Sequence, residues 1–175
     1  MNAGIGEEWV IKFTKAVRAK IPNHLLSHAP QAPYFKNEYY KNGGYITVHK
    51  QVGDLIDFYM IQFYNQVNSK YNSYEELFIH ATGDVFNGTA VKEIAGRGIP
   101  LKKIVVGKPV TSRDVSNTGW VNQTDLGKWA AQAYKDLGWY AGIGHWQYPS
   151  DSTGKSIAQA AEPLMEQCKI NKNCK

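Results

Sequence analysis

Several features that would assign the protein to a specialised class are missing from its sequence. No apolar run approaches the ~20 residues that a membrane-spanning helix needs, so we expect a soluble protein without a membrane span. Basic and acidic residues are intermixed without a run of like charges, and the aromatic residues lie in apolar segments instead of among the basic ones. The net charge of +5 therefore predicts a solvated basic surface, and we expect no nucleic-acid partner.

Cysteine is scarce, and the histidines are dispersed. Cys168 and Cys174 are the only cysteines and lie close together in a lysine-rich segment. This spacing predicts a small disulfide loop, with two free thiols as the alternative in a reducing compartment. His24, His28, His49 and His80 lack the spacing of metal ligands, and we interpret them as surface residues or as histidines satisfied by protein partners. We expect no metal and no cofactor.

The residues that are present suffice for one packed domain. The chain has 175 residues, of which 43% are hydrophobic and 13% aromatic. No low-complexity segment or linker divides it, so we predict a single unit over residues 1–175 with a tail at 161–175. The N-terminal segment has acids where a signal peptide has basic residues, so any export signal has been removed or lies outside this sequence.

Strand-like runs alternate with helical patterns along the chain. Strands are predicted within 24–35, 57–65, 103–110 and 140–149, and helices at 6–22, 89–98, 123–138 and 154–167. The segment 43–56 leaves helix and strand open, and we favour a helix. The helix at 123–138 is expected to begin near the capping residue Thr124 and to end at Gly138, whereas Pro163 should kink or shorten the last helix. This alternation predicts an α/β fold with parallel βαβ units.

The stretch DFYMIQFYNQ at 57–66 changes from apolar to polar on one of its faces. Because strand residues alternate between faces, one set suits packing under helices: Tyr59, Ile61 and Phe63. The opposite set is Phe58, Met60, Gln62 and Tyr64. This second set becomes polar at the carboxyl end of the strand, where parallel α/β folds and barrels place their sites. We therefore predict that Gln62 and Tyr64 face a pocket.

The last predicted strand places an aromatic ring above residues without side chains. Gly142, Gly144, Trp146 and Tyr148 share one face of it. Space beneath a flat indole suits a sugar ring, whose axial C–H groups stack on an aromatic face while its hydroxyls need polar partners. The alternative is that Trp146 is ordinary core packing, and the matching Gln62 and Tyr64 favour a site.

Four segments in this order carry a family resemblance: APQAPYF, DFYMIQFYNQ, IVVGKP and GIGHWQYPSD. Together they resemble the second half of a family 18 glycoside hydrolase, the chitinase family, closest to its fungal and plant-type members. The resemblance covers about residues 9 to 160 and implies a (β/α)8 TIM-barrel fold of which only strands five to eight are present. Length agrees, because a complete barrel takes ~250 residues.

The resemblance assigns binding roles to individual residues. It implies that the Tyr64 hydroxyl holds the N-acetyl carbonyl of the substrate and stabilises the intermediate, and that Gln62 hydrogen-bonds the same sugar. It further implies that Met60 shapes the pocket, that Trp146 forms its floor and that Asn65 contributes beside Tyr64.

His145 stands where the family has an apolar residue. Strand alternation directs His145 away from the pocket, so we expect little effect of this residue on the site.

The acid that the family uses for catalysis has no match in this sequence. The family signature Asp-x-x-Asp-x-Asp-x-Glu supplies a glutamate as general acid, and the N-acetyl group of the substrate attacks the anomeric carbon. Asp54 and Asp57 have the spacing of the first two acids, but the residues that follow supply neither the third acid nor the glutamate.

Three functional classes therefore remain open: a chitinase completed by another half, a chitinase-like lectin, and a structural or assembly protein. The expected ligand is chitin or an N-acetylglucosamine oligosaccharide. A second chain or copy is expected to cover the open barrel edges at 24–31 and 141–148. The resemblance implies a secreted, extracellular protein, in which Asn87 and Asn122 match the glycosylation acceptor pattern.

Overall fold

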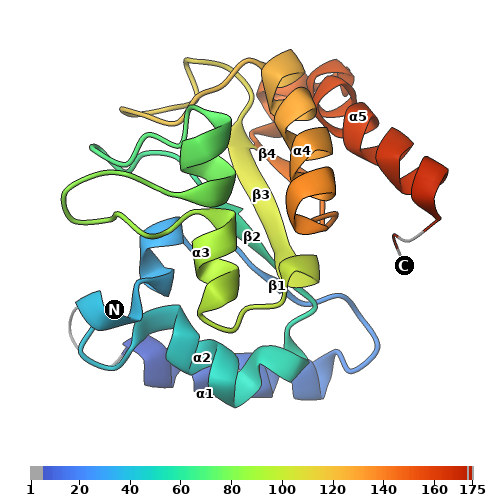
Figure 1. The fold of residues 1–175 in the computed structure, drawn as a ribbon. Helices are drawn as coiled ribbons and strands as arrows, with labels where there is room; N and C mark the ends of the chain where they lie inside the picture. The colour runs from blue at the N-terminus through green and yellow to red at the C-terminus, as the bar shows by residue number, and fades with distance from the viewer. Residues whose placement is uncertain (1–5, 173, 175) are drawn as a thin grey trace.

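A computed structural model of the chain describes residues 6–172 and 174 and shows an α/β fold around a parallel sheet (Figure 1). The strands are β1 (Ser27–His28), β2 (Phe58–Gln62), β3 (Ile104–Pro109) and β4 (Ile143–Trp146). They pair in the order β1-β2-β3-β4, each parallel to its neighbour. The predicted strands and their parallel arrangement are confirmed, although β1 has only two paired residues.

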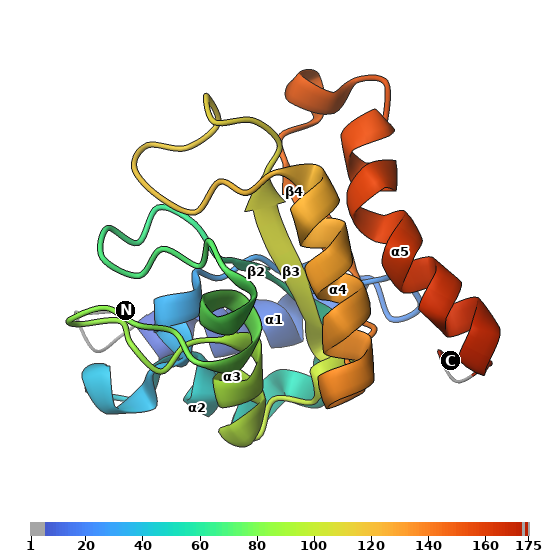
Figure 2. The same cartoon turned by 45° about the horizontal axis from the view of Figure 1, so that its top comes forward.

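The part of the chain that the structure describes has five α-helices, of which α1 precedes the first strand and the others connect or follow the strands (Figure 2). They are α1 (Gly6–Lys20), α2 (Gly44–Val52), α3 (Val91–Gly96), α4 (Gln123–Leu137) and α5 (Lys155–Asn171). Short helical turns span Ala32–Phe35, Asn37–Tyr39, Gly53–Leu55, Glu75–Ile79, Leu101–Lys103 and Tyr148–Asp151. Within the described part of the chain, no helix is long and apolar enough to cross a membrane.

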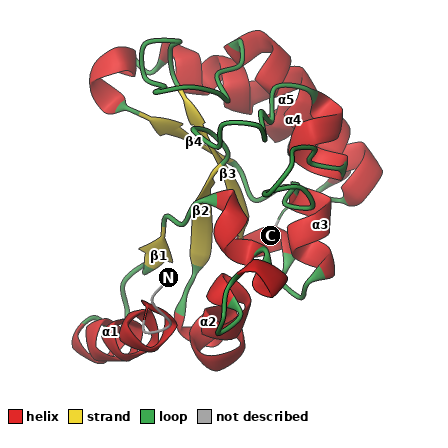
Figure 3. Ribbon diagram, turned by 90° about the vertical axis from the view of Figure 1, so that its left-hand side faces the viewer, coloured by secondary structure: helices red, strands yellow, loops and turns green. Residues whose placement is uncertain are grey.

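The helices cover one face of the sheet and leave the other face open (Figure 3). Tyr59, Ile61 and Phe63 are fully buried on the covered face, whereas the intervening residues of β2 are only half-buried. The predicted alternation of β2 is therefore confirmed. The segment 43–56 is mainly helical, as favoured: it contains α2, in which Tyr45, Val48 and Val52 recur at helical spacing and are all buried.

Two helix boundaries differ from the prediction. The side chain of Asn122, not Thr124, caps α4: its Oδ1 accepts a hydrogen bond from the Thr124 N–H at 2.9 Å. Helix α5 neither ends nor shortens at Pro163 but continues to Asn171, so residues 161 to 171 of the expected tail are helical. Cys168 and Cys174 form the predicted disulfide at the end of this helix.

Close contact between α4 and α5 explains how α5 accommodates Pro163. A proline lacks an N–H, so the Gln159 carbonyl one turn earlier has no helical donor. A Cβ atom added to Gly127 of α4 would lie 2.7 Å from that carbonyl oxygen and 3.1 Å from Pro163 Cγ. The absence of a side chain at Gly127 thus lets α4 pack directly against α5 at its proline.

Replacing Gly127 with alanine is expected to destabilise the fold. The added methyl group must separate α4 from α5, which should lower the free energy of unfolding by about 1–3 kcal/mol. The matched control is Gly96→Ala at the end of α3, where a Cβ meets no atom within 4 Å, so that alanine should be neutral or slightly stabilising. Urea denaturation of both variants measures the difference, and equal stability of the two would contradict this packing.

The dispersed histidines are interpreted from the sequence as surface residues or as satisfied by protein partners, and their contacts agree with this. His28 Nε2 lies 3.2 Å from the Thr14 hydroxyl oxygen, and His49 Nδ1 lies 2.8 Å from the Tyr59 hydroxyl oxygen. Burial lowers the pKa of both rings below the usual value for histidine. His24 is exposed at the surface. Both paired rings therefore belong to the packing of α1 and α2 against the sheet.

Candidate functional site

The register of the sheet brings the predicted site residues onto its open face. Gln62 pairs with Gly107, Gly107 pairs with Gly144, and two residues further along Pro109 pairs with Trp146. The N–H of Phe63 still donates to the Gly107 carbonyl, at 3.2 Å, so the chain stays beside β3 beyond the end of β2. Met60, Gln62, Gly144 and Trp146 thus lie on one face, as predicted from alternation.

Met60 occupies the space that the sequence predicts to be empty beneath Trp146. A Cβ added to Gly144 would lie 2.5 Å from the Met60 sulfur, and one added to Gly107 would lie 3.6 Å from Met60 Cγ. The two glycines therefore make room for the thioether and not for a ligand. The expectation of open space at this point was wrong, and Met60 itself forms the floor of the open face.

Trp146 is not a core residue. Its side chain is at the carboxyl end of β4, and the residue is 51% exposed. The following peptide bond, to Gln147, is cis. Strand β4 ends at Trp146, so Tyr148 lies in the next helical turn and is 77% exposed, contrary to its predicted place in the strand. A half-exposed indole above the Met60 floor is what a stacking platform for a sugar requires.

Tyr64 lies just beyond the carboxyl end of β2. It follows the end of β2 by two residues, and the parallel pairing puts the carboxyl ends of β3 and β4, Pro109 and Trp146, at this same end of the sheet. The residue is only 7% exposed, and burial raises the pKa of its phenol above the usual value. Its hydroxyl has no hydrogen-bond partner among the described residues, although that oxygen is not enclosed. A buried tyrosine usually pairs its hydroxyl, so this group is available to a ligand.

Gln62 and Asn65 already use part of their hydrogen-bonding capacity within the protein. Gln62 Nε2 donates to the Ala29 carbonyl at 2.6 Å, which leaves the amide oxygen for a ligand. Asn65 Oδ1 accepts from the backbone N–H groups of Ser116, at 2.8 Å, and Asn117, at 3.3 Å. Asn65 therefore anchors the loop after β3, a role that the sequence did not indicate.

His145 lies on the covered side of β4, as predicted. Its side chain is 7% exposed, and its Nδ1 is 3.9 Å from Asp151 Oδ2, too far for a hydrogen bond. Burial lowers the pKa of the imidazole, and the Asp151 carboxylate opposes that shift. Asp151 instead accepts the N–H groups of Ser156 and Ile157, both at 2.9 Å, and so caps the start of α5.

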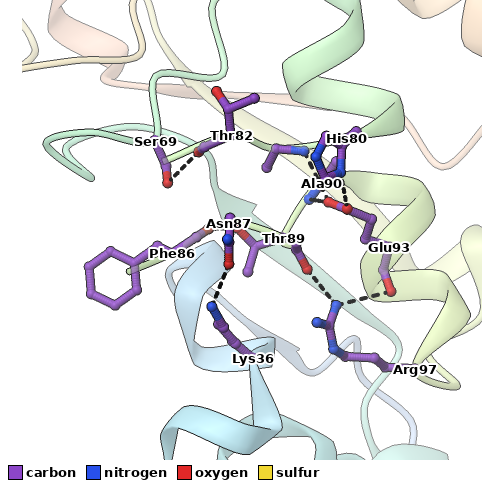
Figure 4. A network of polar contacts seen from close by, with 12 residues as sticks. Lys36, Ser69, His80, Thr82, Phe86, Asn87, Thr89, Ala90, Glu93 and Arg97 are labelled. Carbon is purple, nitrogen blue, oxygen red and sulfur yellow. Dashed lines mark hydrogen bonds and ion pairs between the residues drawn. The ribbon is translucent and has the colours of Figure 1, made fainter. Parts of the chain in front are cut away.

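A polar network fixes the long connection between β2 and α3 (Figure 4). Glu93 accepts the N–H of Ala90 at 2.9 Å, and its other oxygen lies 2.6 Å from the Nδ1 of His80. Lys36 Nζ donates to Asn87 Oδ1 at 2.5 Å and thereby ties the connection to the segment after β1. These contacts are internal to the protein and hold the connection in place.

Asp54 and Asp57 lie far along the sheet from Tyr64. Asp57 precedes β2, and its Oδ2 accepts hydrogen bonds from Arg18 and from the Leu26 N–H, both at 2.7 Å. These donors lower the pKa of the Asp57 carboxyl, with the backbone bond contributing most. The pair therefore serves the amino end of the strands and cannot replace the missing acidic signature at the carboxyl end.

Comparison with solved structures identifies the fold. No protein-family model and no curated protein matches the chain. A chitinase of glycoside hydrolase family 18 from Pseudoalteromonas aurantia matches 90% of the chain with a TM-score of 0.70 and 26% sequence identity. The fold is half of a family 18 barrel. The half-barrel spans about half the length of the structures that it matches, 53% in this case.

Other structures similar to the half-barrel differ in their described activities. A family 18 chitinase from Chromobacterium violaceum is 17% identical over 93% of the chain and 50% of its own, with a TM-score of 0.61. A xylanase and α-amylase inhibitor protein from Scadoxus multiflorus is 15% identical over 86% of the chain and 48% of its own, with a TM-score of 0.52. The fold alone therefore does not determine whether the half-barrel takes part in hydrolysis.

Proposed function

We propose that the chain forms the sugar-binding half of a family 18 site and takes N-acetylglucosamine oligomers such as chitin fragments. The proposal is supported by Tyr64, whose hydroxyl has no hydrogen-bond partner among the described residues, and the half-exposed Trp146, which stand at the carboxyl ends of β2 and β4, at the same end of the sheet. The similarity to a family 18 chitinase at 26% identity supports this ligand class. Gln62 adds an amide oxygen to the same face.

The residues of the half-barrel have complementary tasks in this proposal. The indole of Trp146 stacks on the apolar face of a pyranose, and Met60 closes the space below it. The Tyr64 hydroxyl donates a hydrogen bond to the N-acetyl carbonyl of that sugar. In substrate-assisted cleavage this carbonyl attacks the anomeric carbon, so the same hydrogen bond orients the nucleophile. Protonation of the leaving oxygen requires an acid, and no residue of this chain matches the glutamate that the family signature supplies.

The proposal includes a partner that covers the unpaired edges and supplies the acid. In the sheet that the described residues form, β1 and β4 each have a neighbour on one side only. Exposed apolar side chains lie on the helices at both ends of the half-barrel: Trp9 and Phe13 on α1, and Met165 and Ile170 on α5. Two depressions between β4 and α5 lie along the free edge of β4, and Ile143 lines both of them. A further set of βα units, with a strand along β4, would bury all of these groups.

Removal of the Trp146 ring is expected to weaken binding of chitin oligomers about tenfold, which corresponds to ~1.4 kcal/mol. Isothermal titration of chitotetraose into the chain and into Trp146→Ala measures the change. The control is Trp9→Ala, which removes another exposed indole, from α1, and should leave affinity unchanged. Equal affinity in all three chains would refute the proposed role of Trp146.

A noncatalytic binding protein is the second candidate, favoured by the absence of the acidic signature from the chain. It shares the sugar-binding face and differs in needing no acid from a partner. The disulfide between Cys168 and Cys174 supports an extracellular location for either candidate, because disulfides persist in oxidising compartments.

A further inference from the structure

Lys108 is a buried cationic residue that no part of the proposed site uses directly. Strand alternation puts it on the helix-covered face of β3 with Ile104 and Val106, and its exposure is 0%. Burying an ammonium group is costly unless each of its three donors finds a partner. The contacts of Lys108 therefore identify what the group holds in place.

The ammonium group of Lys108 binds three backbone carbonyls from two loops. Its Nζ donates to the carbonyls of Phe63 at 2.9 Å, Tyr71 at 2.6 Å and Gly119 at 2.8 Å. Phe63 and Tyr71 belong to the loop after β2, and Gly119 belongs to the loop after β3. Three acceptors require three N–H groups, so this geometry fits the charged form, although burial lowers the pKa of Lys108 well below its usual range.

Two of these three carbonyls, those of Phe63 and Gly119, lie next to the backbone of Tyr64. Phe63 is the preceding residue, and a Cβ on Gly119 would lie 2.5 Å from Tyr64 Cα. The N–H of Asn65, the following residue, donates to the Thr118 carbonyl at 2.8 Å. The loop after β3 thus lies directly against the backbone of Tyr64. Lys108 is the one charged group that joins both loops at this contact among the residues that the structure describes.

We infer that Lys108 is a positioning residue for Tyr64. By holding the two loops together, Lys108 sets the orientation of the Tyr64 phenol that receives the N-acetyl group. This inference rests on the proposed function for its ligand. The three hydrogen bonds from Lys108 to the loop carbonyls, which we call the Lys108 clamp, exist without a ligand. Positioning matters because a misplacement of about 1 Å in a binding or reacting group can cost up to ~10²-fold in rate. The inference explains why a strand facing helices carries lysine at this position.

Lys108→Met tests the clamp because methionine has a similar length and no donors. The matched control is Lys103→Met: Lys103 Nζ donates to the carbonyls of Gly53 and Ile56, both at 2.6 Å, at the amino end of the sheet. Both variants lose bonds from an ammonium to carbonyls. We expect only Lys108→Met to shift the ¹⁹F resonance of 3-fluorotyrosine at position 64 and to accelerate amide exchange at Asn65 about tenfold over the control.

Ligand affinity supplies an independent measurement. Lys108→Met should weaken chitotetraose binding about tenfold, and in a Tyr64→Phe background the same change should matter less than twofold, because the positioned hydroxyl is gone. The inference would be overturned if Lys108→Met left the ¹⁹F resonance at position 64 unshifted. It would also be overturned if Lys108→Met lowered chitotetraose affinity equally in the wild-type and Tyr64→Phe backgrounds. If the wild-type chain binds no chitin oligomer, the proposed function fails while the fluorine and exchange measurements still decide the clamp.

Lys108→Arg covers the case in which the methionine variant does not fold. Arginine keeps the charge, but its planar fork cannot place donors on the same three carbonyls. We expect a folded chain with a shifted fluorine resonance at position 64. A folded Lys108→Arg chain with an unshifted resonance would contradict a positioning role.

Discussion

The purified chain alone is expected to leave chitin oligosaccharides intact, and co-expression with the first half of a family 18 chitinase barrel should restore hydrolysis. The chain lacks the glutamate that protonates the leaving oxygen, and removal of a general acid typically lowers a rate by ~10²–10⁴-fold. Release of a chromophore from a chitobioside measures turnover. Hydrogen exchange measures whether amides of β1 and β4 become protected in the co-expressed complex.

The control for this experiment is a first half whose catalytic glutamate is replaced by glutamine. That complex should protect the same edge amides without turnover, which separates assembly from chemistry. Turnover by the chain alone that disappears on one acid-to-alanine change would reveal a substitute acid and contradict the prediction. A stable monomer whose β1 and β4 amides are already protected would contradict the proposed partner.

Gly119→Ala is expected to cause the largest loss of stability among single methyl additions near the site. Gly119 has a φ of +100°, and an added Cβ would lie 2.5 Å from Tyr64 Cα and 2.8 Å from the Phe63 carbonyl oxygen. Backbone strain and overpacking together should lower the free energy of unfolding by roughly 2–5 kcal/mol. Because the clash displaces Tyr64 itself, chitotetraose affinity should also fall, at least tenfold, in titration calorimetry.

Gly138→Ala separates backbone strain from the contact with Tyr64. Gly138 ends α4 with a φ of +69°, and a Cβ there meets no atom within 4 Å. Its alanine variant should lose only about 1–2 kcal/mol and retain affinity. If both variants lose the same stability in urea denaturation and neither loses affinity, the close approach of the two loops does not position Tyr64.

Sequence patterns predicted the parts of the fold that follow from apolar periodicity. The runs that became β2, β3 and β4 were bounded by turn residues, and Tyr59 and Ile61 are buried because helices cover only one side of the sheet. The same alternation placed Trp146 and His145 on opposite faces. The half-barrel itself was predicted from resemblance and length, since no periodicity distinguishes four barrel strands from an open sheet.

Other features depended on partners that are distant in sequence. Pro163 stays inside α5 because Gly127 of another helix packs against the interrupted turn. The carboxamide of Asn65 is a group that often binds sugars, but its oxygen already accepts hydrogen bonds from the backbone of residues 116 and 117. Lysine is usually exposed, so residue type alone predicts an exposed Lys108. Only its two-residue spacing from Ile104 and Val106 could have indicated that its ammonium group is buried.

The two unpaired edges also determine how many units can assemble. All four strands run in the same direction, so a second unit can pair with β4 at one edge and β1 at the other without reversing any strand. In a flat sheet this arrangement would permit unlimited addition of units. In a barrel of eight strands, the second set of four meets the first at both edges and leaves none exposed. In the proposed complex, closure would limit the assembly to two halves and prevent growth into fibres.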